Sequence, residues 1–229
     1  MSINSQITRI QNAKAAIKTA IEGKGVTVGD GTIDTYAEKI NQIVTGDDTD
    51  FIHLISGSSA SLTIPVGTTS IRRSCFYDYY ALTGVTIPNS VTNIGVNSFC
   101  NCSGLLSITI PDSVTAIGAY AFQRCTAMTH AVLPANLTSV EGYVFDGCAK
   151  LQELTIPAKV TTMKVSALNI GSSTNKATIT MKPTTPPTIQ SNTIGANVEK
   201  IIVPIGTGDT YKAASVWSSH ASIIEEATS

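Results

Sequence analysis

The chain has 229 residues, of which 42% are hydrophobic and 14% are charged, and its formal net charge is −1 at pH 7. The charged fraction is low compared with the roughly 25% of an average globular domain. The chain therefore lacks the excess of positive charge that is typical of proteins that bind nucleic acid or an anionic membrane. No apolar run approaches the roughly 20 residues of a membrane-spanning helix, and the first residues lack the basic start and apolar core of a signal peptide. We therefore expect neither nucleic acid nor a membrane among the partners.

Residues 3–22 are predicted to form a helix. One stripe of residues recurs there at alternating steps of four and three, which is the spacing of a coiled-coil seam. A polar residue inside such a seam is typical of segments in which register or oligomeric state matters. The alternative is a helical hairpin whose lysine extends to solvent, and both interpretations stay open. The stripe, a candidate oligomerisation surface, consists of Ile3, Ile7, Ile10, Lys14, Ile17 and Ile21.

A glycine-rich turn over 23–32 precedes a second predicted helix over 33–44. Neither short helix can bury its apolar stripe alone, so residues 1–45 are predicted to form a helical hairpin that anchors or oligomerises the protein. Residues 46–63 are predicted to be a linker followed by an N-terminal cap strand. The glycines lack the GK[ST] ending of a phosphate-binding loop, and the aspartates of the linker lack the spacing of a calcium loop.

An internal repeat occupies 64–178. Its period is about 23 residues, within the range of about 20–50 residues that is typical of a solenoid. Each coil of a solenoid is too small to close a core, and stacking builds a continuous one. The repeat columns are Ile64, Ile87, Ile110, Leu133 and Ile156; Pro65, Pro88, Pro111, Pro134 and Pro157; Phe76, Phe99, Phe122 and Phe145; and Cys102, Cys125 and Cys148.

Each coil is predicted to carry a short strand before its proline, and Gly118 is predicted to allow a turn. The pattern loosens after Ile156, so residues 179–229 are predicted to form a degenerate repeat and a C-terminal cap. There Asp209 is expected to cap a short helix, and the single tryptophan, Trp217, is expected to close the open end of the core.

The five cysteines are an odd number, and three of them share one repeat column. We interpret them as small buried thiols, because no second cysteine pair or histidine stands at the spacing that zinc requires. A chain with a repeat core of this size needs no disulfide framework. We therefore expect no metal and no cofactor.

The solvent-facing strand positions form a flat and mostly neutral surface. Solenoids commonly bind ligands along such a face, although exposed threonines also simply suit strands. The two columns run through Thr63, Thr86, Thr109, Val132 and Thr155, and through Ser61, Gly84, Ser107, His130 and Glu153. From them we take as candidate binding residues Thr63, Thr86, Ser107, Thr109, His130, Glu153 and Thr155.

The run Tyr77-Asp78-Tyr79-Tyr80 interrupts the repeat chemistry, with Tyr79 at the position of the cysteine column. Tyr77 and Tyr80 are predicted to be exposed and are further candidate binding residues, because tyrosine is favoured at recognition surfaces. The alternative is that the first repeat needs bulkier packing against its cap.

No catalytic residue is predicted. His130 and Glu153 are neighbours on one face, in adjacent repeats, as a base and its orienting carboxylate would be. No nucleophile, cleft or oxyanion donor can be argued around them, and a cross-strand pair on an open sheet explains them.

The unit L-x-x-I-T-I-P-x-S-V-T-x-I-G-x-x-A-F-x-x-C-x-x-L, which residues 105–134 match nearly throughout, resembles the BspA-like leucine-rich repeat family, also called the Treponema pallidum type. The tail, with its TTPP run at 184–187 and Trp217, looks like the usual ending of that family. The resemblance covers about residues 60–226. It implies a right-handed leucine-rich-repeat solenoid within an α+β fold, extracellular adhesion at a bacterial surface, and no catalysis.

Residues 7–40 are similar to the openings of phage structural and tail-associated proteins. That resemblance implies a phage or prophage tail protein, made in the cytoplasm without a signal peptide. Its helical segment would bind other virion proteins and its solenoid a host-surface protein or glycan, and a homotrimer would fit by analogy with tail fibres. The alternatives are a bacterial cell-surface adhesin and a purely structural virion decoration protein.

Overall fold

The computed structural model describes residues 60–64 and 66–228. The helical hairpin predicted for residues 1–45 lies outside the described residues, and so does most of the segment predicted as linker and cap strand. The stripe predicted for oligomerisation also lies outside the described residues. Its members are Ile3, Ile7, Ile10, Lys14, Ile17 and Ile21.

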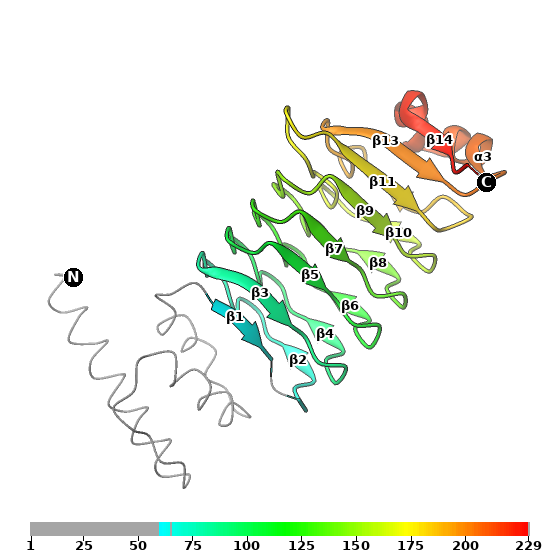
Figure 1. Ribbon diagram of the computed structural model, residues 1–229. Helices are drawn as coiled ribbons and strands as arrows, with labels where there is room; N and C mark the ends of the chain where they lie inside the picture. Colours follow the sequence, from blue (N-terminus) through cyan, green and yellow to red (C-terminus); the bar gives the residue numbers. More distant parts are fainter. Residues whose placement is uncertain (1–59, 65, 229) are drawn as a thin grey trace, which may run out of the picture. The chain divides into compact units, whose positions relative to one another are not determined.

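The longer strands of the coils lie side by side and parallel on one side of the solenoid, which we call the broad sheet (Figure 1). Its paired groups are β1–β3, β5–β7 and β9–β11–β13–β14. The Leu106 N–H donates to the Thr83 carbonyl at 3.1 Å, which links β3 to β5, and β7 lies beside β9. The strands are β1 (Ala60–Thr63), β3 (Leu82–Thr86), β5 (Ser107–Thr109), β7 (His130–Val132), β9 (Glu153–Ile156), β11 (Ala177–Met181), β13 (Val198–Val203) and β14 (Ile224–Glu226).

A second set of two-residue strands forms the opposite side of each coil, which we call the narrow sheet. Its pairings are β2–β4–β6 and β8–β10–β12. The chain passes from the broad to the narrow sheet and back in every coil, which gives the predicted right-handed β-solenoid with a spacing of about 23 residues. The strands are β2 (Ser70–Ile71), β4 (Asn93–Ile94), β6 (Ala116–Ile117), β8 (Ser139–Val140), β10 (Thr162–Met163) and β12 (Thr188–Ile189).

The phenylalanine column fills the space between the two sheets. The rings of Phe76, Phe99, Phe122 and Phe145 stack one above another, with successive centroids 5.0, 5.3 and 5.6 Å apart. These separations follow the roughly 4.8 Å spacing of hydrogen-bonded strands. All four side chains are buried, and buried Leu168 continues the column. Burial of one such side chain stabilises the fold by roughly 1.5–3 kcal/mol.

The cysteine column has a structural explanation. Each thiol is fully buried and donates to the carbonyl of the phenylalanine 26 residues earlier, at 3.1 Å for Cys102 and 3.2 Å for Cys125 and Cys148. Burial raises the pKa of Cys102 and of Cys148 to about 12. All five cysteines are free thiols, and buried Tyr79 takes the same position in the first coil.

The turn predicted at Gly118 is present, since the Ala121 N–H donates to the Gly118 carbonyl at 3.3 Å. Gly118 has no positive φ, but a Cβ atom there would lie 2.5 Å from the backbone nitrogen of Val96 in the preceding coil. The residue is therefore needed for close approach of two coils. The left-handed conformation is instead taken by a column of other residues with φ between 50° and 61°, namely Ser74, Asn97, Tyr120, Tyr143 and Ser166.

The cap predicted at Asp209 is wrong. The helix α3 (Gly208–Ala213) has Thr207 at its N-cap, and Asp209 lies inside the first turn. The Glu226 carboxylate accepts hydrogen bonds from the N–H groups of Gly206 and Gly208 at 3.0 and 2.7 Å. A side chain from β14 therefore satisfies donors at the start of this helix, and these bonds lower the pKa of Glu226.

Two aromatic residues pack at the last coils, beside the 3₁₀ helix η2 (Trp217–Ile223). The buried Trp217 donates from Nε1 to the Pro187 carbonyl at 2.7 Å, and the Tyr211 hydroxyl donates to the Pro183 carbonyl at 2.7 Å. Their rings meet edge to face with centroids 5.0 Å apart. Trp217 thus occupies the buried position that the sequence predicts. Among the described helices, none is both long enough and apolar enough to cross a membrane.

Candidate binding surface

The two columns predicted for the broad sheet are present in the predicted register. Thr63 pairs with Thr86, and Ser107 pairs with His130. Glu153 and Thr155 pair with Thr178 and Thr180, which extends both columns beyond the predicted residues. All seven candidate residues of this face are exposed: Thr63, Thr86, Ser107, Thr109, His130, Glu153 and Thr155.

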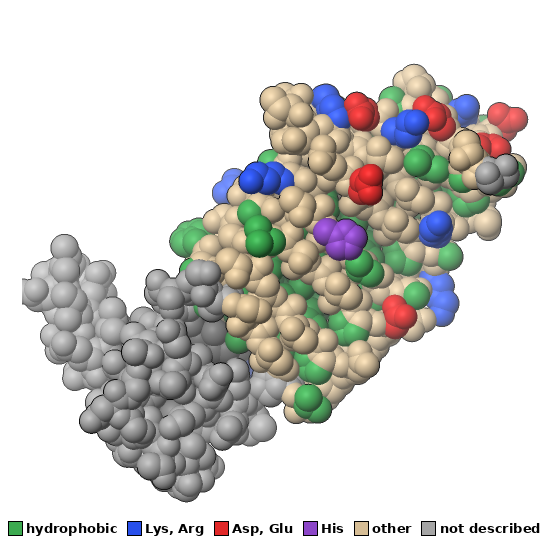
Figure 2. Space-filling model, in the orientation of Figure 1, with side chains coloured by type: hydrophobic (Ala, Val, Ile, Leu, Met, Phe, Trp, Pro, Cys, Tyr) green, Lys and Arg blue, Asp and Glu red, His purple; other side chains and the backbone are tan. Residues whose placement is uncertain are grey.

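The broad-sheet face is mostly uncharged. Figure 2, in the orientation of Figure 1, shows only scattered charged side chains among neutral surface. Towards the C-terminal coils, Lys200 and Glu225 form an exposed ion pair with a 2.8 Å N–O distance. Two exposed apolar side chains interrupt the hydroxyl groups, Leu106 at 54% and Val132 at 40% exposure. Such a face offers hydrogen bonds and limited apolar contact, and it has little long-range attraction for ions.

The hydroxyl groups within the broad-sheet strands have no partners among the described residues, whereas that of Thr129, just before β7, donates to the Leu106 carbonyl at 3.3 Å. Within the described part of the chain, the side chains of Thr86, Ser107, Thr109 and Thr155 make no hydrogen bond. Their donors and acceptors therefore face water and can exchange it for a ligand.

The narrow sheet differs, and it carries a threonine column that our sequence analysis missed. The hydroxyls of Thr92, Thr115 and Thr161 donate to the carbonyls of the threonines one coil earlier, at 3.1, 3.4 and 3.3 Å. The constant repeat interval could have revealed the column, but it could not show which way the hydroxyls point. Its exposed members are Thr69, Thr92, Thr115, Thr138 and Thr161.

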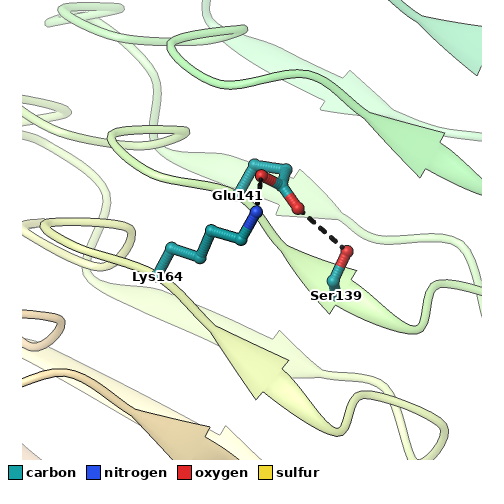
Figure 3. A network of polar contacts seen from close by, with 3 residues as sticks. All are labelled: Ser139, Glu141 and Lys164. Carbon is teal, nitrogen blue, oxygen red and sulfur yellow. Dashed lines mark hydrogen bonds and ion pairs between the residues drawn. The ribbon is translucent and has the colours of Figure 1, made fainter.

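Glu141 and Lys164 form a charged pair beside the narrow sheet. Figure 3 shows Glu141 between Ser139 and Lys164. Its carboxylate accepts from the Ser139 hydroxyl at 3.2 Å and lies 2.6 Å from the Lys164 ammonium. An exposed pair of this kind contributes at most about 1 kcal/mol to stability.

His130 and Glu153 lie in neighbouring strands but do not form a catalytic arrangement. No hydrogen bond or ion pair joins them in residues 60–64 and 66–228, and both side chains are exposed. The same described residues contain no group of three or more side chains that could hold a metal ion.

The tyrosine run lies on the loop that leads into β3. Tyr80 is 60% exposed and Tyr77 is 36% exposed, while Tyr79 between them is buried. Asp78 has a left-handed backbone with φ of 61° and accepts a hydrogen bond from the Asn101 amide at 2.7 Å. Both exposed tyrosines therefore lie where the sequence predicts, beside a carboxylate and an amide.

The stacked coils, their parallel strands and the buried phenylalanine column define a leucine-rich-repeat solenoid. The chain belongs to the BspA-type leucine-rich repeat family, because the family described as "BspA type Leucine rich repeat region" matches residues 56–198 in six copies. Proteins of this family are typically found at the cell surface, and they are generally non-enzymatic binding proteins.

Several solved structures are similar to this chain. A leucine rich cell surface protein from Faecalibacterium prausnitzii is 20% identical over 74% of this chain and 60% of its own, with a TM-score of 0.34. A leucine-rich repeat protein from Bacteroides ovatus is 19% identical over 73% of this chain and 60% of its own, with a TM-score of 0.38. The pneumococcal vaccine antigen PcpA is 15% identical over 74% of this chain and 68% of its own, with a TM-score of 0.29.

The chain thus spans 60% of the length of the first two of these proteins. A comparison with curated proteins found no match. The similarity of residues 7–40 to phage tail-associated proteins stays a prediction.

Proposed function

We propose that this solenoid is the non-catalytic binding module of a bacterial cell-surface adhesin, and that its ligand contacts the broad-sheet face. The observation that carries the proposal is the difference between the two sheets. The exposed hydroxyls within the broad-sheet strands lack partners among the described residues, whereas those of Thr92, Thr115 and Thr161 beside the narrow sheet donate to backbone carbonyls. Family membership supports the adhesin role.

The chemistry of the face sets the kind of ligand. Rows of hydroxyls, with His130 and Glu153 beside them, suit a polar partner that is held by many short hydrogen bonds. Because the face has few charges, binding should depend only weakly on ionic strength, unlike association that is steered by charge.

The test compares two threonines of one coil. Thr109 is exposed on the broad-sheet face and Thr115 lies just before the narrow-sheet strand β6. The full chain is added to cultured epithelial cells, and bound protein is measured for the wild type, Thr109→Arg and Thr115→Arg. We expect Thr109→Arg to lower binding at least tenfold and Thr115→Arg to leave it unchanged. Equal losses, or equal retention, would show that the broad-sheet face is not the binding surface.

A second candidate is a phage or prophage tail-associated virion protein. The isoleucine stripe with its single lysine, over residues 3–21, favours it. In that case residues 1–45 would bind other tail proteins and hold a homo-oligomer together, and the solenoid would contact the host surface. A decoration protein would join particles without binding cells.

Peptide quantification across fractions of an induced culture separates these candidates. The fractions are the cell envelope, the soluble medium and density-banded particles. We expect enrichment in the envelope. Enrichment with banded particles would replace the adhesin by a virion component, and cell binding by those particles would then distinguish a receptor-binding protein from a decoration protein.

A further inference from the structure

Because the coils repeat, the residue at each exposed position can be compared with the residues at the same position in the other coils. Positions that serve only the fold should carry similar residues in successive coils, as the phenylalanine column does. The first coil departs from this rule at two exposed positions on one loop, where it alone carries tyrosine. The position of Tyr77 is held in later coils by Cys100, Gln123 and Asp146, and that of Tyr80 by Ser103, Thr126 and Ala149.

The loop that carries both tyrosines is held in place by backbone hydrogen bonds. The Asp78 N–H donates to the Cys100 carbonyl of the next coil at 2.9 Å, and the Tyr80 N–H donates to the Asp78 carbonyl at 2.9 Å. Buried Tyr79 fixes the middle of the run. The two exposed rings are therefore presented by an ordered backbone, which lowers the entropy cost of binding.

Hydrogen-bonding groups lie directly beside the rings. The Asn101 Nδ2 donates to Asp78 Oδ1 at 2.7 Å, and the Asn101 side-chain oxygen accepts no hydrogen bond from the described residues. Partial desolvation and the neighbouring Asp78 carboxylate raise the pKa of the Tyr80 phenol. The Asp78 carboxylate, the Asn101 amide and the Tyr80 phenol thus lie close together, on a loop that also exposes Tyr77.

We propose that Tyr77, Tyr80 and the Asp78–Asn101 pair form a subsite for one ring of an uncharged glycan. Aromatic rings pack against the C–H faces of a sugar, while a planar carboxylate and amide accept from and donate to its neighbouring hydroxyls. This inference rests on the proposed binding function and names the ligand class of one additional contact, on the loop that precedes the broad-sheet strand β3.

The surroundings favour a glycan over a protein loop. The residues that dominate protein interfaces fill well-packed pockets from which water is excluded. Tyr80, at 60% exposure, stands instead on an open loop beside polar Asp78 and Asn101. The negative charge of Asp78 disfavours anionic sugars by like-charge repulsion, which leaves neutral ones.

The test measures binding of the full chain to an array of neutral and acidic oligosaccharides built from hexose and N-acetylhexosamine units. The two main variants take the residues of the third coil, Tyr80→Thr after Thr126 and Tyr77→Gln after Gln123, so that the fold already accommodates them. Ile205→Ala, which removes an equally exposed apolar side chain from the loop after β13, is the matched control.

We expect the wild type to bind neutral oligosaccharides, Tyr80→Thr to lower that binding at least tenfold, and Tyr80→Phe to lower it only a few-fold because the ring remains. Ile205→Ala should bind as the wild type does. The proposal is overturned if no neutral oligosaccharide binds, if only acidic ones bind, or if Tyr80→Thr binds normally.

Failure of this subsite is distinguishable from failure of the proposed function. If Tyr80→Thr changes nothing on the array while Thr109→Arg still abolishes binding to epithelial cells, the broad-sheet face remains the binding surface and the glycan subsite is wrong. If both variants bind cells as the wild type does, the proposed function fails as well.

Discussion

The middle coils and the last coils build the same sheet by different means. In the middle, paired residues of the broad sheet hold the same position in successive repeats, as Ser107 and His130 do. Later the interval between partners first lengthens, from Glu153 to Thr178, and then shortens, from Thr178 to Lys200. The phenylalanine and cysteine columns end at 145 and 148, yet parallel pairing continues to β14.

The difference shows that backbone hydrogen bonding and side-chain stacking are separate requirements of a solenoid. Backbone hydrogen bonds do not depend on side-chain identity, so the ladder tolerates a coil that is longer or shorter. Stacked side chains need a constant period, since each ring must meet the ring of the next coil. Where that period is lost, Trp217 and Tyr211 fill the core and bond to the carbonyls of Pro187 and Pro183.

The largest effect should come from breaking the aromatic column in the middle coils. Phe122 stacks on Phe99 and Phe145, so Phe122→Ala should lower the free energy of unfolding by about 3–5 kcal/mol. Urea unfolding followed by circular dichroism measures the loss. Phe122→Leu is the control and should cost less, because Leu168 already occupies this column. A loss below about 1 kcal/mol for the alanine variant would refute the column as the main core.

The second largest effect should come from alkaline pH, which should lower the free energy of unfolding through the middle coils. Burial raises the pKa of Cys102 and Cys148 from 9.0 to about 12, so the folded state holds protons that the unfolded state releases. The stabilisation is complete below pH 9 and is lost as pH rises through about 12, at roughly 1.4 kcal/mol per thiol and pH unit.

The measurement is the urea midpoint of the reduced protein at pH 8.5 and pH 10.5. Cys102→Ser keeps a donor for the Phe76 carbonyl, which Cys102 reaches at 3.1 Å, but removes the titrating thiol, so its midpoint should fall less over the same interval. An identical pH dependence for the wild type and the variant would show that this thiol does not couple to folding.

A smaller and more local effect is expected at the last coils. Trp217→Phe removes the Nε1 donor and leaves the Pro187 carbonyl unpaired, which should cost about 1–3 kcal/mol. Hydrogen exchange should then accelerate at the amides of β13 and β14 more than at those of β5 and β7. Tyr211→Phe, which removes the bond to Pro183, should act at the same strands. Equal acceleration throughout would show that the two regions unfold together.

The smallest expected effect has the opposite sign. The buried hydroxyl of Ser98 has no hydrogen-bond partner among the described residues, and buried Ala121 holds the same position one coil later. Ser98→Ala should therefore raise the free energy of unfolding by up to about 1 kcal/mol. Ser113→Ala is the contrasting control, because its hydroxyl donates to the Val91 carbonyl at 2.7 Å, and it should destabilise. A loss of stability in Ser98→Ala would contradict the assignment of an unsatisfied hydroxyl.

Much of this fold could be predicted because the period of the sequence is also the period of the structure. The position of Phe122 within its repeat is enough to place its side chain in the core, and that of Thr109 is enough to place it on the exposed face. Tyr79 could be assigned to the core in the same way, from the cysteine column that it interrupts.

Other features depend on contacts between coils, which a column does not show. Gly118 is needed because the backbone of Val96 lies against it, and the donors before α3 are satisfied by Glu226, which is distant in sequence. The candidate surface likewise depends on side-chain direction. Exposed threonines occur on both sides, and only the observed contacts show that the hydroxyl of Thr92 donates to the Thr69 carbonyl while that of Thr109 has no partner among the described residues.

The near-identical junctions between the middle coils have a consequence for how such a chain changes over generations. A gene segment that encodes one coil can be duplicated or deleted by unequal recombination, and the new junction will again place one phenylalanine ring on another about 5 Å away. The number of coils is therefore a heritable property that natural selection can change by one whole coil at a time. The end that contains Trp217 cannot be copied in this way, so growth of the array is confined to its interior.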